Sequence, residues 1–475
     1  MSAMAAARHG SGEPCESQTE SAGSTTNGAG LPFVWMVPLL IIACTLFGLA
    51  SYPTVEGWGL WCQWDQEGLG NYLKELPTHP DRPLHLLPSV TAWLLPGDYG
   101  WGCMELGGLM ALCRGWLLWN LGSMLRMDWQ SCLLMVTLGL FEPMWPGCGY
   151  ERFHAAQASL LCLLGALNLG AWHARNGGWW KLLIGVLLSL AGFMTYQGLF
   201  LVSLGAPFAF WVLGMRPVAR SLALILLTAC IGYLCWYLIT ALFFRAGYVA
   251  NHSESLAARQ LVTRLWAAII KGRMLTFVSF GITLACLTGF QRDILNRGRM
   301  GWLLVLVLSA PLFGLIFFKN PVWLSDPERV WLPVSVWLVV LAAGWAAPSG
   351  SKSWRFTRCW VPALLACGLL STLQALRYVH LQHAVLGVLE AESAGWEKGL
   401  PVRVVDTTDE LGQLYTFLAP HHLNMAWRAK GHSGNLVIEN HRVESTLGVK
   451  TNRVVLVKER KHPFWPEQWS AKLDP

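Results

Sequence analysis

Acidic side chains of the kind that can act as a general base lie in Trp58–Trp101, a polar stretch between two long apolar segments. Within it, Asp65 and Glu67 follow a tryptophan-rich turn directly after the first apolar segment. A carboxyl group at the rim of a bilayer can have a pKa raised by desolvation, which suits a general base. We therefore predict Asp65 and Glu67 as catalytic candidates. The alternative is a pair of solvated loop acids beside an ordinary belt of interfacial tryptophans.

Asp81 and Arg82 come directly before Pro83–Pro96, an apolar run too short to cross a bilayer and closed by proline at both ends. We expect this run to form an interfacial helix, with Pro83 in its first turn and Asp81 as its cap. A guanidinium at headgroup depth is suited to bidentate phosphate binding, so Arg82 is a candidate substrate ligand, with Asp81 beside it. Capping alone would also explain Asp81, and an arginine that reaches toward lipid headgroups would explain Arg82.

Further polar groups lie where other apolar segments end, and we predict them as substrate-binding candidates: Glu151, Arg152, Tyr196, Gln197 and Arg329. Each also has a structural alternative: a local ion pair for the first two, a buried polar pair that joins helices for the next two, and salt-bridge anchoring for the last. Placed at the boundary of one membrane face, these groups suit a lipid-phosphate substrate whose tail stays in the bilayer. Glu105 and Arg114, inside the second apolar segment, are expected on opposite sides of one helix and not to pair.

The composition indicates what positions these residues. Hydrophobic residues make up 54% of the 475-residue chain and charged residues only 13%, too few to cover the surface of a soluble protein of this length. We therefore predict a polytopic α-helical membrane protein. Its net charge of +7 comes from short cationic clusters between apolar runs, which indicate topology and not nucleic-acid binding. With about 20 apolar residues per span, we expect about eleven transmembrane helices: 33–52, 102–122, 130–146, 154–172, 179–194, 199–214, 220–243, 274–290, 300–318, 329–347 and 359–378.

The predicted organisation has three parts. Residues 1–32 are polar and rich in glycine and serine, and we expect a disordered cytoplasmic tail. Residues 33–378 form the transmembrane domain, with the first outer loop and its interfacial helix at 53–101. Every short loop expected inside carries a cation, which places the N-terminus in the cytoplasm. Cys62 and Cys148 both fall in outer loops, where a disulfide between them is an alternative to two free thiols.

Residues 379–475 are polar and contain no cysteine, and we predict a small α/β domain on the outer face. Short apolar runs predict three strands: Pro401–Val405, Asn435–Ile438 and Arg453–Val457. Between them, Thr408–Ala419 and His421–Lys430 are expected to be helical.

In the order of its segments, the chain resembles the membrane-embedded glycosyltransferases of the GT-C class, particularly the bacterial multi-span members. The resemblance covers residues 33–378. It consists of an outer-loop acid after the first span (WDQEG), an Arg-Pro-Leu that opens an interfacial helix (DRPLHLLPSV), and a Thr-Tyr-Gln turn (MTYQG).

The resemblance implies a sugar donor on a polyprenyl phosphate, a glycan or lipid acceptor, and a location in the bacterial cytoplasmic (inner) membrane. By the same resemblance Asp65 would be the base and Arg82 would hold the donor phosphate. Many members carry two adjacent acids in the first outer loop, whereas Gln66 separates Asp65 from Glu67 here. The base and any need for a divalent cation, Mg²⁺ or Mn²⁺, therefore stay open.

Two other functions compete with this hypothesis. An O-antigen-type polysaccharide polymerase would also use outer-loop arginines on lipid-linked glycans, and would make long repeats instead of single additions. A flippase or transporter of lipid-linked sugar would need a continuous polar path, whereas the predicted spans contain few ionisable residues and no internal repeat.

Overall fold

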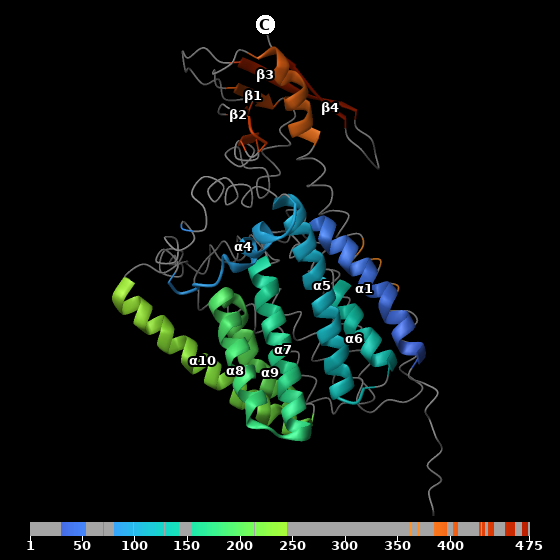
Figure 1. Ribbon diagram of the computed structural model, residues 1–475, viewed down its shortest axis with the longest axis vertical. Coiled ribbons are helices and arrows are strands. Elements are labelled where there is room, and N and C mark those ends of the chain that lie inside the picture. The colour runs from blue at the N-terminus through green and yellow to red at the C-terminus, as the bar shows by residue number, and fades with distance from the viewer. Residues whose placement is uncertain are drawn as a thin grey trace, which may run out of the picture.

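The computed structural model of the chain is mostly helical (Figure 1). The residues that it describes are 30–53, 70, 80–97, 99–127, 129–141, 154–212, 214–244, 362, 366, 369, 384–396, 402–406, 427–428, 430–432, 436–440, 452–460 and 468–473.

The first half of the described chain forms a bundle of helices. Their bounds are α1 (Gly30–Ala50), α4 (Leu87–Leu94), α5 (Tyr99–Met124), α6 (Trp129–Phe141), α7 (His154–Asn176), α8 (Trp179–Thr195), the 3₁₀ turn η4 (Gln197–Leu199), α9 (Phe200–Val212) and α10 (Arg216–Phe244). Apart from α4 and η4, these helices overlap the apolar segments predicted between residues 33 and 243. The segments predicted between 274 and 378 lie outside the described residues, except for helical positions 362, 366 and 369.

By length and composition alone, two of the described helices could cross a membrane: His154–Asn176 and Arg216–Phe243. Met36–Ala50 and Trp179–Thr195 are apolar but shorter. The predicted total of about eleven spans therefore stays a prediction.

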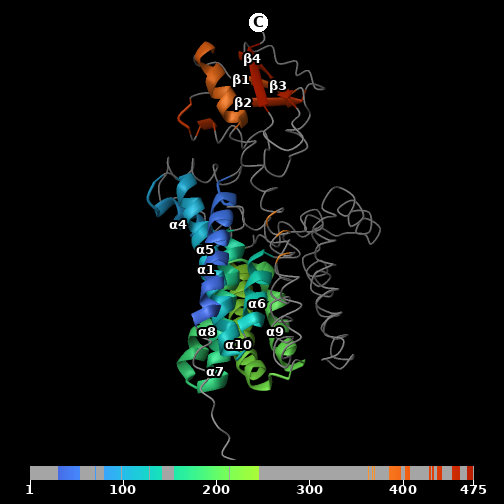
Figure 2. The same ribbon diagram turned by 90° about the vertical axis from the view of Figure 1, so that its right-hand side faces the viewer.

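Helix α7 lies at the centre of the bundle, where it packs against α5, α8 and α10, while α1 packs along α5 (Figures 1 and 2). Small residues allow the close approach of α1 and α5. A Cβ on Gly107 would collide with the Ser51 side chain, and one on Gly108 would lie 3.0 Å from the Cys44 carbonyl oxygen. Glycine at such positions lets backbones approach and gain van der Waals contact, a common means of helix association in membranes.

Polar side chains join the helices inside the bundle. Arg114 Nη1 of α5 donates a 3.0 Å hydrogen bond to Gln157 Oε1 of α7. Between the same two helices, farther from α4, Asn120 Nδ2 of α5 donates to Asn168 Oδ1 of α7 at 2.9 Å. Arg114 is buried whereas Glu105 is exposed, so the two lie on different sides of α5, as predicted.

The exposed faces of several helices are strongly apolar. Large hydrophobic side chains that are at least 40% exposed occur on α1, α8 and α10: Ile41, Ile42, Leu49, Trp179, Trp180, Leu183, Ile184, Leu187, Leu224, Leu227, Ile231, Leu234, Leu238, Ile239, Leu242 and Phe243. Soluble monomers rarely expose contiguous apolar surface on this scale, and such surface marks contact with lipid or protein.

A helix is present within the expected run 83–96, but it starts later than predicted. Helix α4 begins at Leu87, with Leu86 at its N-cap, no side-chain cap and Pro88 in its first turn. Residues 83–86 form turns instead. The prediction that Pro83 opens the helix and that Asp81 caps it is therefore wrong. Proline fits the first helical turn because its missing N–H is not needed there, and Pro88 takes that position.

Four strands in the last part of the chain form one mixed sheet. They are β1 (Val402–Asp406), β2 (Leu436–Asn440), β3 (Asn452–Arg460) and β4 (Gln468–Leu473), in the order β2-β1-β3-β4. β1 is parallel to β2 and β3, and β3 is antiparallel to β4. The sheet and the adjoining helical residues 384–392 lie beyond the end of the bundle at which α4 lies (Figures 1 and 2).

The three predicted strands overlap β1, β2 and β3, whereas β4 was not predicted. Its sequence, QWSAKL, alternates polar and apolar residues but has no β-branched residue. Of the two helices expected between the strands, 408–419 lies outside the described residues, and Trp427 and Arg428 are helical within 421–430.

The contact between α4 and α5 gives a first prediction. A Cβ on Gly102 would collide with the backbone carbonyl oxygen of Ala92, which cannot rotate away. We expect Gly102→Ala to force α4 from α5 and to lower the free energy of unfolding by about 1–3 kcal/mol, seen as a lower melting temperature in detergent. Gly232→Ala is the control, because its Cβ would lie 3.7 Å from Leu190 Cδ1, an ordinary contact. Equal melting temperatures for the two variants would contradict the prediction.

Candidate functional site

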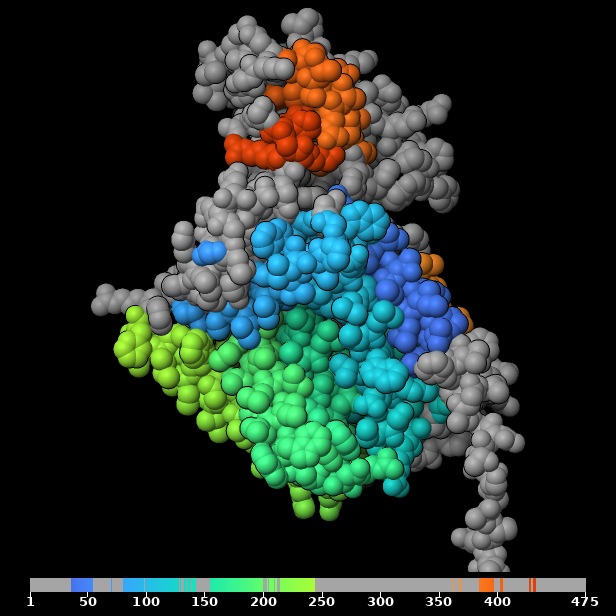
Figure 3. Space-filling view, viewed as in Figure 1, coloured from blue at the N-terminus to red at the C-terminus, as the bar shows by residue number. Residues whose placement is uncertain are grey.

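Residues 80–86 run across the bundle at the end at which α4 lies (Figure 3). Hydrogen bonds to α8 and α10 hold their backbone there. The carbonyl oxygen of Pro80 accepts from Trp236 Nε1 at 2.8 Å, and that of Asp81 accepts from Tyr233 Oη at 3.0 Å. The amide of Leu84 donates to the last turn of α8, at the carbonyl of Met194 (3.2 Å). Tyr233 and Trp236 are three residues apart on α10, so their side chains lie on the same face of that helix.

The Asp81 side chain joins this segment to the turn between α8 and α9. Gln197 Nε2 donates a 2.6 Å hydrogen bond to Asp81 Oδ2, across 116 residues of sequence. Both side chains are buried, with relative exposures of 1% for Asp81 and 9% for Gln197. A buried carboxylate needs such donors because transfer from water without them is very costly. Gln197 thus makes the kind of buried polar contact that was one of its two predicted roles.

The backbone around Tyr196 brings Gln197 into position. Helix α8 ends at Thr195, and Tyr196 follows in an extended conformation, with its amide bonded to the carbonyl of Gly192. The ring of Tyr196 lies over Gly198, where a Cβ would collide with it. The Tyr196 carbonyl oxygen accepts from Ser159 Oγ of α7 at 3.4 Å, so α7 also supports the turn.

Arg82 lies between these fixed points. Its own carbonyl oxygen accepts from the amide of His85 at 3.2 Å and from His85 Nδ1 at 2.9 Å. Since a carbonyl oxygen only accepts, Nδ1 carries a proton in this contact. The half-buried Arg82 side chain therefore extends from a backbone held on both sides.

His154, the first residue of α7, is buried with a relative exposure of 1%. Neither of its ring nitrogens has a hydrogen-bond partner among the described residues. It precedes Ser159 by five residues, about 7.5 Å along the helix axis, so it lies at the same end of the bundle as Asp81. A buried imidazole without partners requires an explanation, because an unmade hydrogen bond costs about 1–3 kcal/mol.

Of the predicted site residues, the structure brings together Asp81, Arg82, Tyr196 and Gln197. The others lie outside the described residues: Asp65, Glu67, Glu151, Arg152 and Arg329. The same applies to Cys62 and Cys148, so their disulfide stays untested.

Sequence reasoning missed Tyr233, Trp236 and His154. Two aromatic residues with polar atoms, three positions apart near one end of an apolar run, were a signal for the first two. His154 stood in the sequence as the first residue of the predicted span 154–172, with nothing to mark it as part of the site.

The site has one carboxylate, one guanidinium and several neutral donors. That set can bind a phosphate at the guanidinium, while Gln197 already occupies one oxygen of the carboxylate. Among the described residues no group of three or more His, Cys, Asp or Glu could hold a metal ion, and the question of a divalent cation stays open.

Comparison with known proteins gives no name to this arrangement. No family model matches the chain, and no curated protein has significant sequence similarity to it.

The Asp81–Gln197 contact predicts an asymmetry between two variants. Gln197→Leu removes the amide that donates to the buried Asp81 Oδ2 atom. We therefore expect the free energy of unfolding to fall by about 1.5–3 kcal/mol. Asp81→Asn keeps an oxygen that accepts from Gln197 and removes the buried charge, so the loss should be smaller. Denaturant unfolding in detergent measures both values. A larger loss in Asp81→Asn would show that the carboxylate depends on contacts other than Gln197.

His154 gives a prediction of the opposite sign. His154→Leu removes two buried polar atoms that lack partners and should raise the free energy of unfolding by about 1–3 kcal/mol. His173→Leu, also on α7, is the matched control, because His173 Nδ1 is 2.9 Å from Ser221 Oγ, a hydrogen bond that this variant loses. It should lower stability. Thermal unfolding in detergent compares them, and destabilisation by His154→Leu would mean that the imidazole is satisfied in solution.

Proposed function

We propose that the protein is a membrane glycosyltransferase that moves a sugar from a polyprenyl-phosphate carrier to a hydroxyl of a surface glycan or lipid. The observation that supports this most is the placement of Arg82. Its carbonyl is bonded within its own turn, and its neighbours Asp81 and Leu84 are bonded to α10 and α8 at the end of an apolar helical bundle. A guanidinium in a fixed place at such a boundary suits a phosphate whose lipid tail lies in the bilayer.

The apolar outer faces of α1, α8 and α10 support a membrane location for the bundle. In this proposal the bundle is part of a multi-span domain in a bacterial cytoplasmic membrane, with the N-terminus in the cytoplasm. The carrier tail lies among lipids along the bundle, and the phosphate reaches Arg82 at the α4 end.

In the proposed reaction, the acceptor hydroxyl attacks the anomeric carbon of the donor sugar, and the bond from that carbon to the phosphate oxygen breaks. The acceptor proton goes to Asp65, with Glu67 as the second candidate, and polyprenyl phosphate leaves with the bonding electrons. Arg82 stabilises the negative charge that develops on the leaving phosphate. Arg152 and Arg329 are further candidates for this contact, and Glu151 is a further candidate for the base.

Asp81 then acts as a positioning residue. Its carboxylate accepts from Gln197 and its carbonyl accepts from Tyr233. These two bonds hold Asp81 in place, and with it the start of the Arg82 backbone. An adjacent carboxylate also partly offsets the positive charge of Arg82, which favours release of the phosphate product.

The test uses purified protein in detergent, radiolabelled polyprenyl-phosphate sugars and a crude glycan or lipid acceptor, with release of free polyprenyl phosphate as the readout. We expect Arg82→Lys, which keeps the charge but loses the bidentate geometry, to reduce release about tenfold or more. Arg175→Lys, at an exposed position at the other end of α7, should leave release unchanged.

Asp65→Asn should abolish release if Asp65 is the base. Release that survives this change but is lost in Glu67→Gln or Glu151→Gln would move the base and keep the reaction. No release from any donor by folded wild-type protein would overturn the proposed function in favour of a transporter, and long repeating products would identify a polymerase.

A further inference from the structure

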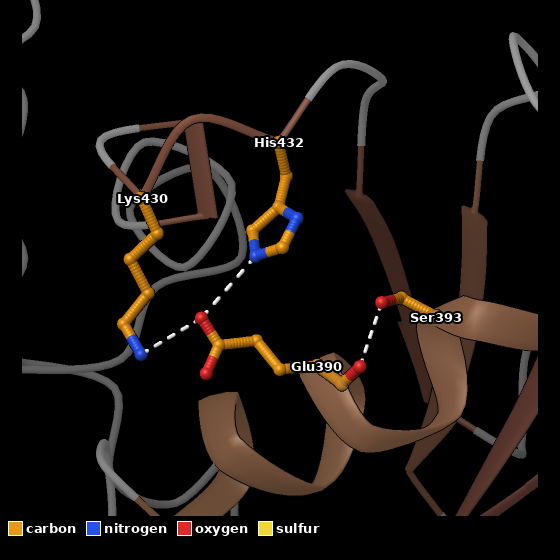
Figure 4. A network of polar contacts seen from close by, with 4 residues as sticks. All are labelled: Glu390, Ser393, Lys430 and His432. Carbon is orange, nitrogen blue, oxygen red and sulfur yellow. Dashed lines mark hydrogen bonds and ion pairs between the residues drawn. The ribbon is translucent and has the colours of Figure 1, made fainter.

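A compact group of polar side chains lies beside the C-terminal sheet (Figure 4). Glu390, in the helical residues 384–392, accepts at Oε1 from Lys430 Nζ at 3.0 Å and from His432 Nε2 at 3.2 Å. Ser393 Oγ donates to the Glu390 carbonyl at 2.6 Å where the helix ends. We call Glu390, Lys430 and His432 the polar patch.

Aromatic rings pack against one residue of the polar patch, His432. The His432 ring stacks on Trp427, with 3.9 Å between ring centroids and 15° between planes. Trp427 is 2% exposed and belongs to the hydrophobic core, and Trp396 lies 5.4 Å from it. The stack fixes the plane of the His432 imidazole. The ring and the Glu390 carboxylate bonded to it are therefore in position before any ligand binds.

The patch has unused hydrogen-bonding capacity that faces solvent. Its three side chains have relative exposures of 34% for Glu390, 31% for Lys430 and 30% for His432. Within the described residues, both bonds to the carboxylate use Oε1, so Oε2 is an open acceptor. The ammonium of Lys430 has three donors and uses one here, and His432 Nδ1 also makes no bond to the described part of the chain.

The charge of the patch selects the kind of ligand. Partial burial alone would raise the pKa of Glu390, but hydrogen bonds from Lys430 and His432 outweigh it and hold this pKa below its usual range. The carboxylate is therefore ionised at neutral pH and balances the Lys430 ammonium. A phosphate or carboxylate ligand would need net positive charge here. A neutral molecule that both donates and accepts many hydrogen bonds fits better.

We propose that the polar patch binds a neutral, hydroxyl-rich glycan, which is the acceptor substrate of the proposed glycosyltransferase. Sugar hydroxyls donate to Glu390 Oε2 and accept from Lys430, and the sugar ring packs beside the partly exposed imidazole of His432. The identification of the glycan as the acceptor rests on the proposed function. Its location agrees with that role, because the sheet and the segment that carries Arg82 lie at the same end of the bundle (Figures 1 and 2).

The test measures binding of the full-length protein in lipid nanodiscs to an array of neutral and phosphorylated surface oligosaccharides, with no donor present. We expect binding to neutral oligosaccharides and at least tenfold weaker binding by Glu390→Gln, which loses the carboxylate charge and the acceptor Oε2. His432→Phe keeps a ring on Trp427 but loses both nitrogens, and should also bind at least tenfold more weakly. Glu392→Gln, two residues along the same helix, is the control and should bind as the wild type.

Thermal unfolding of each variant separates lost binding from lost folding, because His432→Phe preserves the stack even if Glu390→Gln loosens residues 427–432. Failure of the wild type to bind any neutral oligosaccharide would overturn the proposal, as would preference for phosphorylated ones or unchanged binding in both patch variants. Glycan binding without release of polyprenyl phosphate would overturn the transferase and leave the glycan site. If both patch variants release polyprenyl phosphate normally and no glycan binds on the array, the glycan site would be overturned and the transferase would stand.

Discussion

The buried hydrogen bond between Asp81 and Gln197 is the contact on which the candidate site depends. A carboxylate that is 1% exposed must be satisfied inside the molecule, and the amide that satisfies it comes from a turn 116 residues away. That requirement holds the segment before α4 against the end of α8. Tyr233 and Trp236 then attach the same segment to α10 through two consecutive carbonyl groups. Arg82 is located by these bonds, and its chemistry follows from where they place it.

The bundle beneath the site has a hydrophobic interior, crossed by a few polar contacts, and an outer surface that is also apolar. Its polar contacts, such as Arg114–Gln157 and Asn120–Asn168, lie between helices, while leucines and isoleucines cover the outside of α10. In the proposed membrane location, exclusion of water cannot drive helix association, so close backbone approach and interhelical hydrogen bonds would carry it. The glycines of α5 and the amides of α7 meet both needs, and they give the site a rigid base.

The sequence predicted elements well wherever a local pattern decides the structure. Apolar runs of the right length indicated the helices from α1 to α10, and β-rich apolar runs indicated β1 to β3. It failed at Asp81, because either of two prolines, Pro83 and Pro88, could open a helix and only tertiary contacts chose between them. The partners Gln197 and Tyr233 belong to segments far along the chain, and pairing across such distances leaves no local signal.

The two binding surfaces that we propose differ in charge. Around Arg82, the Asp81 carboxylate accepts from the neutral amide of Gln197, and the guanidinium beside it is the group that we propose binds the donor phosphate. At Glu390 the Lys430 ammonium balances the carboxylate, and both Lys430 and His432 contact its Oε1 atom. A transferase that joins a lipid phosphate sugar to a neutral hydroxyl needs one surface of each kind, since a single cationic site would favour the donor at both positions. The separation of the two surfaces along the chain therefore agrees with two substrates of unlike charge that meet between them.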